Sequence, residues 1–236
     1  MCIRDSVYTT DPRIAPKAQK LDRITFEEML EMASLGAKVL QTRSVAMAMR
    51  HNVNLQVRSS FSDAPGTLVV NEDEIVEQEK ISGIAYSPDE AKSTIQGLPD
   101  KPGIAASIFG ELAENHINVD MIVQSAASEG QQADITFSLG RGDLDKALWL
   151  IGGAREKLGF RAIDSDAGVT KISVVGTAMR SQPGVARAMF ETLAERGINI
   201  EVISTSEIKI SVLIASEYTE LAVRSLHTAF GLDSED

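Results

Sequence analysis

Cysteine is nearly absent from this chain, and aromatic residues are scarce. Cys2 is the one cysteine among 236 residues, and aromatic side chains make up 5% of the sequence. A single thiol excludes a disulfide framework and a thiolate metal cluster, and it fits a reducing, cytoplasmic compartment. His51, His116 and His227 lack the spacing of metal ligands, so we expect them to be solvated or half-buried and predict no metal site.

Long apolar runs and excess positive charge are missing as well. No apolar run approaches the roughly 20 residues of a membrane helix, and no basic-then-apolar leader opens the sequence. We therefore expect neither a membrane partner nor secretion. The net charge of −11 argues against a nucleic-acid partner. It permits a phosphate ligand, because helix N-termini and local basic groups hold anions in acidic proteins.

The sequence contains one long internal repeat. Pro102-Gly103, followed by Leu-Ala-Glu and by Ile117-Asn118, returns at a constant offset of 81 residues as Pro183-Gly184, Leu-Ala-Glu and Ile198-Asn199. No residue is inserted between the turn and the strand in either copy. Similarity at a fixed offset means that one supersecondary unit is used twice. The remainder of the chain has to be read separately.

The region before residue 71 reads as a mixture of helices and strands. Thr25 and Glu28 have the spacing of a capping box, in which a hydroxyl accepts from the third helical amide and a glutamate reaches back. They predict a helix start, with an interruption at Gly36 and a second helical run that stops at Asn52. The segments expected next are a short strand over residues 55–58 and a loop over residues 59–66.

The acidic stretch over residues 71–80 reads as a linker or, equally well, as a solvated helical face. The first repeat copy after it has the order strand, helix, strand, strand, helix, strand, which is the ferredoxin-like split unit. Its strands are expected at residues 92–97, 119–125, 133–139 and 160–164, and its helices at 104–115 and 144–158.

The second copy lacks the last of these strands. Its strands are expected at residues 171–176, 200–204 and 208–215, and its helices at 185–196 and 217–230. A sheet edge left unpaired has to be covered. The strand-like residues 81–86 are the segment we expect to cover it, which makes the first copy an insertion within the second.

The Pro-Gly loops before the two repeated helices are candidate anion sites. Proline pre-sets φ for the first helical turn, glycine lets a ligand approach, and the free amides of that turn can bind a carboxylate. We expect Asn118 and Asp120 at the same end of the module, where Asp120 would accept from the ammonium group of an amino acid. Ordinary helix-start punctuation and sheet pairing between repeats are the alternative explanations of these residues.

Several longer strings resemble the aspartokinase family. Asp-Lys-Pro-Gly at residues 100–103, Ile-Asn-Val-Asp at 117–120 and the stretch at 203–212 resemble its paired ACT domains. Independently, residues 7–13, 20–22, 34–40 and 58–61 resemble the last part of its amino-acid kinase domain.

The resemblance implies an α+β fold with nested ferredoxin-like ACT domains after the remnant of an α/β kinase domain. We expect the kinase remnant at residues 1–70, a linker at 71–80, a strand donated to the second ACT domain at 81–90, and the two ACT domains at 91–166 and 167–236.

The resemblance also implies an activity and its partners. In the whole enzyme, ATP with magnesium phosphorylates L-aspartate to 4-phospho-L-aspartate, which leads to lysine, threonine, methionine and diaminopimelate. It further implies feedback inhibition by lysine or threonine, a homodimer through the ACT domains, and a catalytic α-type chain as a further partner.

Residue by residue, the resemblance assigns two sets of binding positions and no catalytic residue. The ATP-binding positions are Tyr8, Thr9, Thr10, Asp11, Pro12, Arg13 and Lys38. The effector-binding positions are Asp100, Lys101, Pro102, Gly103, Ile104, Ala105, Asn118, Val119, Asp120, Gln124, Val185, Ala186, Asn199, Ile200, Ser206 and Glu207. Without the resemblance, Lys38 reads as a solvated helix lysine.

The chain also departs from the family pattern. It lacks the Lys-Phe/Tyr-Gly-Gly phosphate loop and the substrate-binding segment, and residues 1–6 do not match the family. We therefore expect a C-terminal aspartokinase fragment that is inactive alone. The alternative is a separate regulatory subunit that binds lysine or threonine and pairs with a catalytic chain. Such a subunit would begin near Ile81 and does not need residues 7–70.

Overall fold

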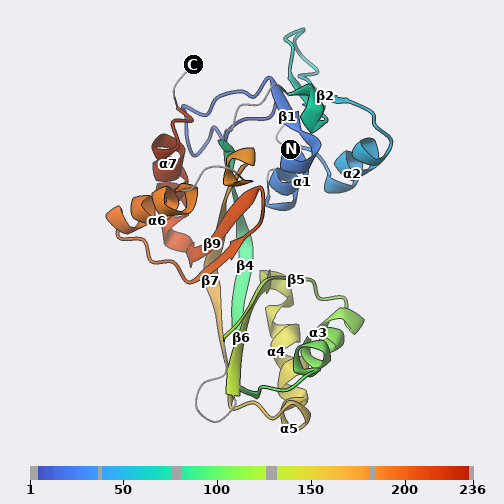
Figure 1. Cartoon of the computed structure of the whole chain (residues 1–236), viewed down its shortest axis with the longest axis vertical. Helices are drawn as coiled ribbons and strands as arrows, with labels where there is room; N and C mark the ends of the chain where they lie inside the picture. The colour runs from blue at the N-terminus through green and yellow to red at the C-terminus, as the bar shows by residue number, and fades with distance from the viewer. Residues whose placement is uncertain (1–4, 37–38, 76–80, 126–131, 181–183, 234–236) are drawn as a thin grey trace. The chain divides into compact units, whose positions relative to one another are not determined.

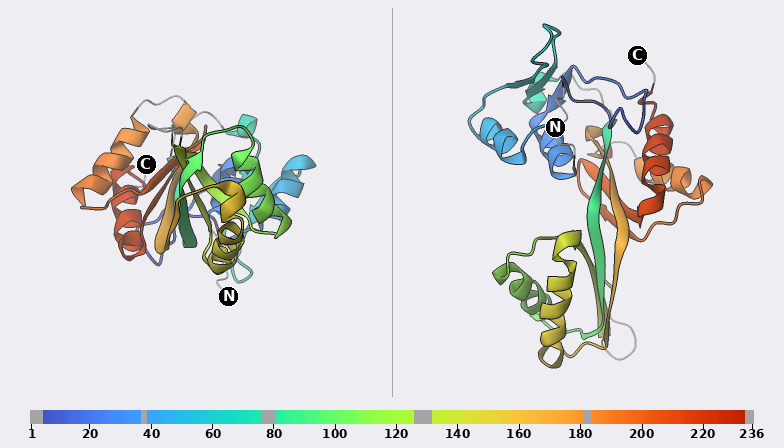
Figure 2. Two further views of the ribbon diagram at one scale, coloured as in Figure 1. Left: turned by 90° about the horizontal axis from the view of Figure 1, so that it is seen from below. Right: turned by 180° about the vertical axis from the view of Figure 1, so that it is seen from behind.

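The computed structural model describes residues 5–36, 39–75, 81–125, 132–180 and 184–233 (Figure 1). The chain divides into two compact units. The first unit comprises Met1–Ser87, Lys171–Glu201 and Thr205–Asp236, and the second comprises Pro88–Thr170 and Val202–Ser204. Strands β4 (Ile81–Pro99) and β7 (Ala162–Gly176) each run from one unit into the other (Figure 2).

The second unit holds the first repeat copy. Its strands besides β4 and β7 are β5 (Val119–Gln124) and β6 (Gln132–Gly140), and its helices are α3 (Ile104–Glu114), α4 (Leu144–Gly153) and α5 (Arg155–Leu158). β6 pairs antiparallel with both β4 and β5, and β7 is the next neighbour of β4. Apolar side chains of α3 and α4 pack with those of β4 and β6 in one core. The ferredoxin-like order predicted from the sequence is confirmed.

The first unit holds the second repeat copy. The elements of this copy are α6 (Val185–Glu195), β8 (Val202–Thr205), β9 (Lys209–Ala215) and α7 (Thr219–Ala229), and all of them except Val202–Ser204 of β8 belong to the first unit. Strands β4, β7, β9 and β8 are neighbours in that order. Helices α6 and α7 lie on one face of these strands in both views of Figure 2. Ile84 of β4 belongs to the same core as Ile172 of β7, so the start of β4 packs with the second copy.

The two repeated helices are equivalent in detail. Both α3 and α6 have 11 residues, and both follow a glycine with positive φ. Ile104, Ile108 and Leu112 are buried in α3, and the residues at the same offset, Val185, Met189 and Leu193, are buried in α6. The repeat seen in the sequence is therefore a repeat of packing as well.

The first unit also contains the region before residue 71. This region has the strand order β1 (Arg23–Thr25), β3 (Thr67–Val70), β2 (Leu55–Val57), with helices α1 (Phe26–Ser34) and α2 (Thr42–Arg50). The short 3-10 helix η1 (Glu72–Glu74) follows it. The core of this region includes Ala85 of β4 and Val175 of β7. Because Ile84 and Ala85 belong to different cores, the two faces of β4 pack against α6 and α7 on one side and this region on the other.

The capping box predicted at the start of α1 is confirmed. The Glu28 amide donates to Thr25 Oγ1 at 3.1 Å, and the Thr25 amide donates to Glu28 Oε2 at 3.2 Å. Glu28 is buried and its other carboxylate oxygen accepts from Ser82 Oγ at 2.6 Å. The cap therefore also fastens α1 to strand β4.

Three element boundaries differ from the prediction. The strands expected at residues 81–86 and 92–97 are one strand, β4, and those expected at 160–164 and 171–176 are one strand, β7. Ser-Pro-Asp at residues 87–89, a combination typical of turns, stays extended within β4, and pairing with β6 begins at Glu90. The single helix expected at residues 144–158 breaks at Ala154 into α4 and α5, directly after two glycines.

The domain boundaries at residues 70, 80, 90 and 166 remain predictions. The division into units does not separate the first region from the second repeat copy. Most of the expected linker, residues 76–80, lies outside the described residues. None of the helices in the described part of the chain combines the length and the apolar character needed to cross a membrane.

Candidate functional site

Six of the residues predicted to bind ATP form one segment of the first unit at residues 8–13, with a bridge at Tyr8 and a turn at Pro12 and Arg13. The Thr9 amide donates to the Gln19 carbonyl at 2.9 Å, and the Gln19 amide donates to Thr9 Oγ1 at 3.0 Å. Tyr8 pairs with Lys20, and its hydroxyl donates to Asp5 at 3.0 Å. The segment is therefore held as one arm of a hairpin-like loop.

Thr9 and Thr10 face inward, against strand β4. Both are buried, and the Ile84 amide donates to the Thr9 carbonyl at 2.7 Å. Thr10 Oγ1 donates to the Ile84 carbonyl at 2.8 Å. The Thr9 carbonyl and the Thr10 side chain fix the segment to β4, whereas Asp11, Pro12 and Arg13 are less buried.

Arg13 carries the only positive charge within the segment, and Asp11 binds it. The Arg13 guanidinium lies 2.7 Å from Asp11 Oδ2, with its side chain 67% exposed and that of Asp11 9% exposed. The Tyr86 hydroxyl also donates to Asp11, at 3.4 Å. A phosphate that binds here would share the guanidinium with Asp11 or displace it. Lys38, the second predicted cation, lies outside the described residues.

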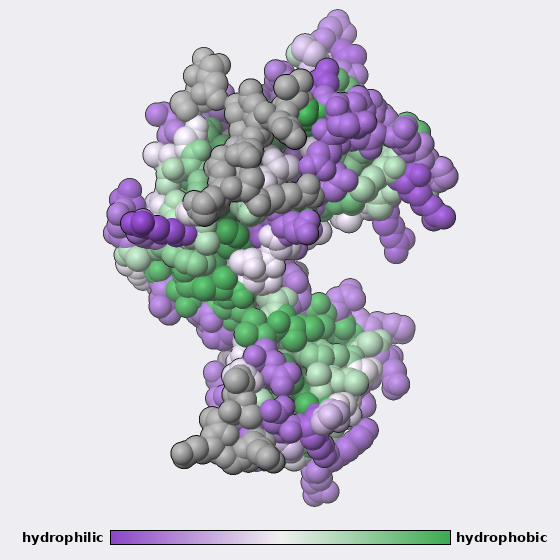
Figure 3. Space-filling view, viewed as in Figure 1, coloured by the Kyte–Doolittle hydropathy of each residue, from purple (hydrophilic) through white to green (hydrophobic). Residues whose placement is uncertain are grey.

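The described residues fit a triphosphate only in part. Within them, no group of three or more histidine, cysteine, aspartate or glutamate side chains is placed to hold a metal ion. Two surface hollows of the first unit lie away from residues 8–13 and are lined by residues of α2 and of the loop after β2. Figure 3 shows mainly hydrophilic side chains around that loop. We therefore assign no closed nucleotide pocket to this part of the chain.

The effector positions of the first copy begin with an exposed loop. Residues 100–103 are exposed, Ile104 is buried in the core, and Ala105 is half-buried. Gly103 is the N-cap of α3 with φ +91° and gives no side-chain cap, and the space where a Cβ would stand is open. The loop before α3 is therefore exposed, and the binding of an effector there remains a prediction.

Asp120 does not lie at that end of the module, which corrects the sequence-based expectation. In the sheet register Asp120 is level with Ser138 and Lys92, whereas the loop follows Pro99, seven residues further along β4. At about 3.3 Å per residue the separation is roughly 20 Å. The strand after a crossover helix begins at the end opposite the helix start, which the prediction overlooked. One amino acid cannot touch both groups within one copy.

Strand β5 has a bulge directly after Asp120. The register with β6 shifts between Asp120 and Val123, and buried Met121 has φ +47°, a conformation rare for residues other than glycine. The shift leaves Ile122 51% exposed and Val123 41% exposed on consecutive positions. Figure 3 shows hydrophobic surface over the part of the second unit that Figure 1 labels β5. Gln124, at the end of β5, is exposed.

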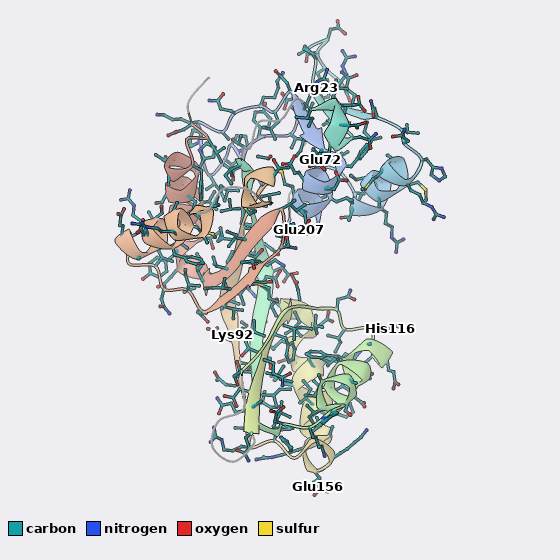
Figure 4. All side chains as sticks on the ribbon, in the orientation of Figure 1. Arg23, Glu72, Lys92, His116, Glu156 and Glu207 are labelled. Atoms are coloured by element: carbon teal, nitrogen blue, oxygen red, sulfur yellow. The ribbon has the colours of Figure 1, made fainter. Side chains whose placement is uncertain are left out.

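The effector positions of the second copy lie in a different unit. Gly184, with φ +120°, precedes buried Val185 and half-buried Ala186. Asn199 is exposed and Ile200 is half-buried, before β8. Ser206 and Glu207 are exposed in the turn between β8 and β9, where Figure 4 labels Glu207.

The chain matches three family models: amino acid kinase over residues 4–59, and ACT domains over residues 93–148 and 172–230. The aspartate kinase of Pseudomonas putida is 53% identical over 231 residues, which are 98% of this chain and 56% of that protein. A crystal structure of aspartokinase alpha and beta subunits is 46% identical with a TM-score of 0.60, and the match covers 64% of this chain and 99% of that chain. The chain belongs to the aspartokinase family.

The chain spans 56% of the length of these curated relatives. Aspartokinase III of E. coli, in complex with aspartate and ADP, is 27% identical with a TM-score of 0.80 over 96% of this chain and 50% of that one. The same protein in complex with lysine and aspartate is 28% identical with a TM-score of 0.75 and the same coverage.

Sequence reasoning missed His227. His51 and His116 are exposed as expected, but His227 is only 2% exposed, and its Nε2 lies 2.8 Å from Thr9 Oγ1. Burial lowers the pKa of the imidazole below its ordinary value, and the charge of Asp233 partly offsets the shift. The helical spacing of Val223, Leu226 and His227 was the available signal, because it places all three on one apolar face.

Proposed function

We propose that this chain is the regulatory part of an aspartokinase with the last part of its kinase domain. In the whole enzyme, a side-chain carboxylate oxygen of L-aspartate bonds to the γ-phosphorus of ATP while the bridging β–γ oxygen leaves with ADP. Family membership and the aspartate and ADP bound to the E. coli relative support this reaction. We assign ATP and its magnesium ion to the whole enzyme and name no magnesium ligand in this chain.

Within this proposal, residues 8–13 contribute to the nucleotide site. Arg13 would offset phosphate charge, and Tyr8, Asp11 and Pro12 would shape the surface beside it. Thr9 and Thr10 would act indirectly, since both side chains are buried: Thr10 Oγ1 donates to the Ile84 carbonyl of β4, and Thr9 Oγ1 binds the Gln19 amide and His227. Lys38 remains a predicted phosphate contact.

The effector proposal rests on the opposite placement of Asp120 and the loop over residues 100–103. We propose that lysine or threonine binds between the β5 edges of two copies of the chain. When two copies of an edge strand pair antiparallel, the start of one lies beside the end of the other. Asp120 of one copy then comes close to Gln124 and the helix start of its partner. The carboxylate would receive the ammonium group, and the α3 amides would receive the carboxylate.

The exposed apolar residues of β5 support the same pairing. Ile122 and Val123 both point out of the module because of the bulge, and apolar side chains on a sheet edge favour contact with another strand. The second-copy positions Val185, Ala186, Asn199, Ile200, Ser206 and Glu207 remain predictions for the matching half of this sensor.

Calorimetry combined with sedimentation tests the effector proposal. The chain should be a dimer that binds lysine or threonine, and Asp120→Ala should weaken binding by about 2–5 kcal/mol while leaving the dimer intact. Ile122→Lys should abolish both the dimer and the binding heat. Glu114→Ala, which removes an exposed carboxylate at the end of α3, serves as the control and should bind as the unmodified chain does. Normal binding by the Ile122→Lys monomer would contradict the proposal.

The second candidate is a separate regulatory subunit that pairs with a catalytic chain. The match to a structure of alpha and beta subunits, which covers 99% of the matched chain, favours it. The kinase-family match over residues 4–59 favours the first candidate, since a purely regulatory subunit does not need that region. The upstream reading frame separates the two, because an in-frame phosphate loop would exclude the subunit.

A further inference from the structure

His227 is a buried, titratable side chain that belongs to neither the proposed nucleotide site nor the proposed effector site. It lies on α7 of the second repeat copy, beside Val223 and Leu226 in the core of that copy. An aliphatic side chain would suit these neighbours, yet the imidazole Nε2 is 2.8 Å from Thr9 Oγ1 of the predicted nucleotide segment. The contact joins residues 218 positions apart in the sequence. It therefore bears on how the ACT part and the kinase part communicate.

Thr9 also forms hydrogen bonds to two other segments of the chain. Its amide and hydroxyl bind Gln19 and its carbonyl accepts from Ile84, so that each of its polar groups has a partner. Gly83 of β4 lies so close to the Thr9 carbonyl that any side chain there would collide with it. Ile14, just after the segment, packs against the core of the second copy. Thr9 thus has little freedom to move without α7 and β4.

We infer that His227 is a positioning residue for residues 8–13, and that through Thr9 it transmits the position of α7 in the second ACT module to this segment. Asp11 and Arg13 lie two and four residues after Thr9 and form the ion pair that a bound phosphate would contact. A displacement of α7 would therefore change where the guanidinium lies. Only the identity of the ligand rests on the proposed function, because the coupling itself concerns residues of this chain.

The charges around His227 make its protonation state informative. Asp233, bound by Thr228 at 3.2 Å, is the charged group whose field acts on the ring. On the segment, Arg13 is paired with Asp11, and Lys20 lies 3.2 Å from Asp22. Burial keeps the imidazole neutral near pH 7. Protonation makes both ring nitrogens donors, which removes any acceptance from the Thr9 hydroxyl.

Amide hydrogen exchange in the full chain tests the inference. His227→Leu and Thr9→Val remove this hydrogen bond from either side, but Thr9→Val also removes an acceptor of the Gln19 amide and is therefore compared at Ile84 alone. His227→Leu should lower the protection of the Gln19 and Ile84 amides about ten-fold, and Thr9→Val should do the same at Ile84. His227→Gln, whose amide can reach the same position, should restore most of the protection. In the unmodified chain the protection of these amides should fall as pH drops from 7.5 to 5.5. In His227→Gln it should stay constant over this range, because glutamine does not titrate.

Val223→Ala is the matched control, because it removes buried volume from the same helix without touching Thr9. It should lower protection in α7 and β9 and leave the pH profile at Gln19 and Ile84 unchanged. The inference is wrong if the Ile84 amide is as well protected in Thr9→Val and His227→Leu as in the unmodified chain, or if His227→Leu and Val223→Ala give the same pattern of protection.

A separate titration with MgADP distinguishes the two proposals. Protection of residues 8–13 by MgADP in the unmodified chain, lost in His227→Leu and regained in His227→Gln, would support both. If MgADP changes nothing while the exchange pattern holds, the nucleotide assignment fails and the positioning role of His227 stands.

Discussion

At the scale of single residues, Gly36 allows the first region to approach strand β4. Its φ is +103°, and a Cβ built on it would lie 2.5 Å from the Tyr86 carbonyl oxygen. Alanine is disfavoured at this φ and would also push against the β4 backbone. Gly36, which was predicted to interrupt a helix, is therefore needed for close packing against β4. It lies two residues before Lys38, a predicted ATP-binding position.

Gly36→Ala should destabilise the chain by roughly 1–3 kcal/mol, through strain and the collision with Tyr86. Urea unfolding followed by circular dichroism measures this change. Gly110→Ala is the control with the opposite sign, because Gly110 lies inside α3 with open space around it. It should stabilise by about 0.5–1 kcal/mol. Equal effects of the two substitutions would refute the explanation.

His227 predicts a dependence of stability on pH. Its folded-state pKa is lowered by burial, so the unfolded chain binds a proton at a higher pH than the folded chain. Stability should therefore be greatest above about pH 6.5 and should fall as pH drops from there toward the lowered pKa. Thermal melting between pH 7.5 and 5.5 measures the loss, and His227→Gln should flatten it. A melting temperature that rises on acidification would contradict the assigned sign.

At the scale of elements, the capping box of α1 joins two parts of the first unit. Thr25→Ala should cost about 1–2 kcal/mol in the free energy of unfolding, since it removes the cap and a hydroxyl partner of buried Glu28. Ser34→Ala, in the last turn of the same helix, is exposed and should change stability by less than about 0.5 kcal/mol. Chemical denaturation compares the two, and similar losses would show that the cap contributes nothing particular.

Elements with local signals could be predicted from the sequence. The capping box gave the start of α1, and the constant offset gave the equivalence of α3 and α6. The continuity of β4 and β7 could not be predicted, because long-range pairing overrides the turn signal at residues 87–89. The position of Asp120 could have been predicted from the order of the elements. The prediction failed because it placed the start of helix α3 and the start of strand β5 at the same end of the module.

The candidate sites were less predictable than the elements. Residues 8–13 were found through resemblance, but their inward-facing threonines and the pairing of Arg13 with Asp11 depend on contacts made across the fold. The bulge at Met121 has no sequence signal, since methionine rarely adopts positive φ. His227 shows the same limit, because its partner is 218 residues away.

At the scale of the whole molecule, we expect no aspartate kinase activity from this chain alone. The phosphate loop that the family uses does not occur in its 236 residues, and the kinase-family match covers only residues 4–59. A coupled assay for ADP with MgATP and L-aspartate should give no signal above the blank. Turnover that depends on aspartate would mean that the described segment carries more of the reaction than we assign to it.

Strands β4 and β7 have a genetic consequence. They are hydrogen-bonded neighbours, and the chain passes through them from the first unit to the second and back, at residues 87–88 and 170–171. Almost the whole second unit, Pro88–Thr170, is thus encoded by one uninterrupted stretch of the gene. In the protein, its two ends lie on the neighbouring strands β4 and β7. Recombination at these two points would exchange the first ACT module as one piece. Thr9, Ile84 and His227 all belong to the first unit, so the contacts among them would be kept.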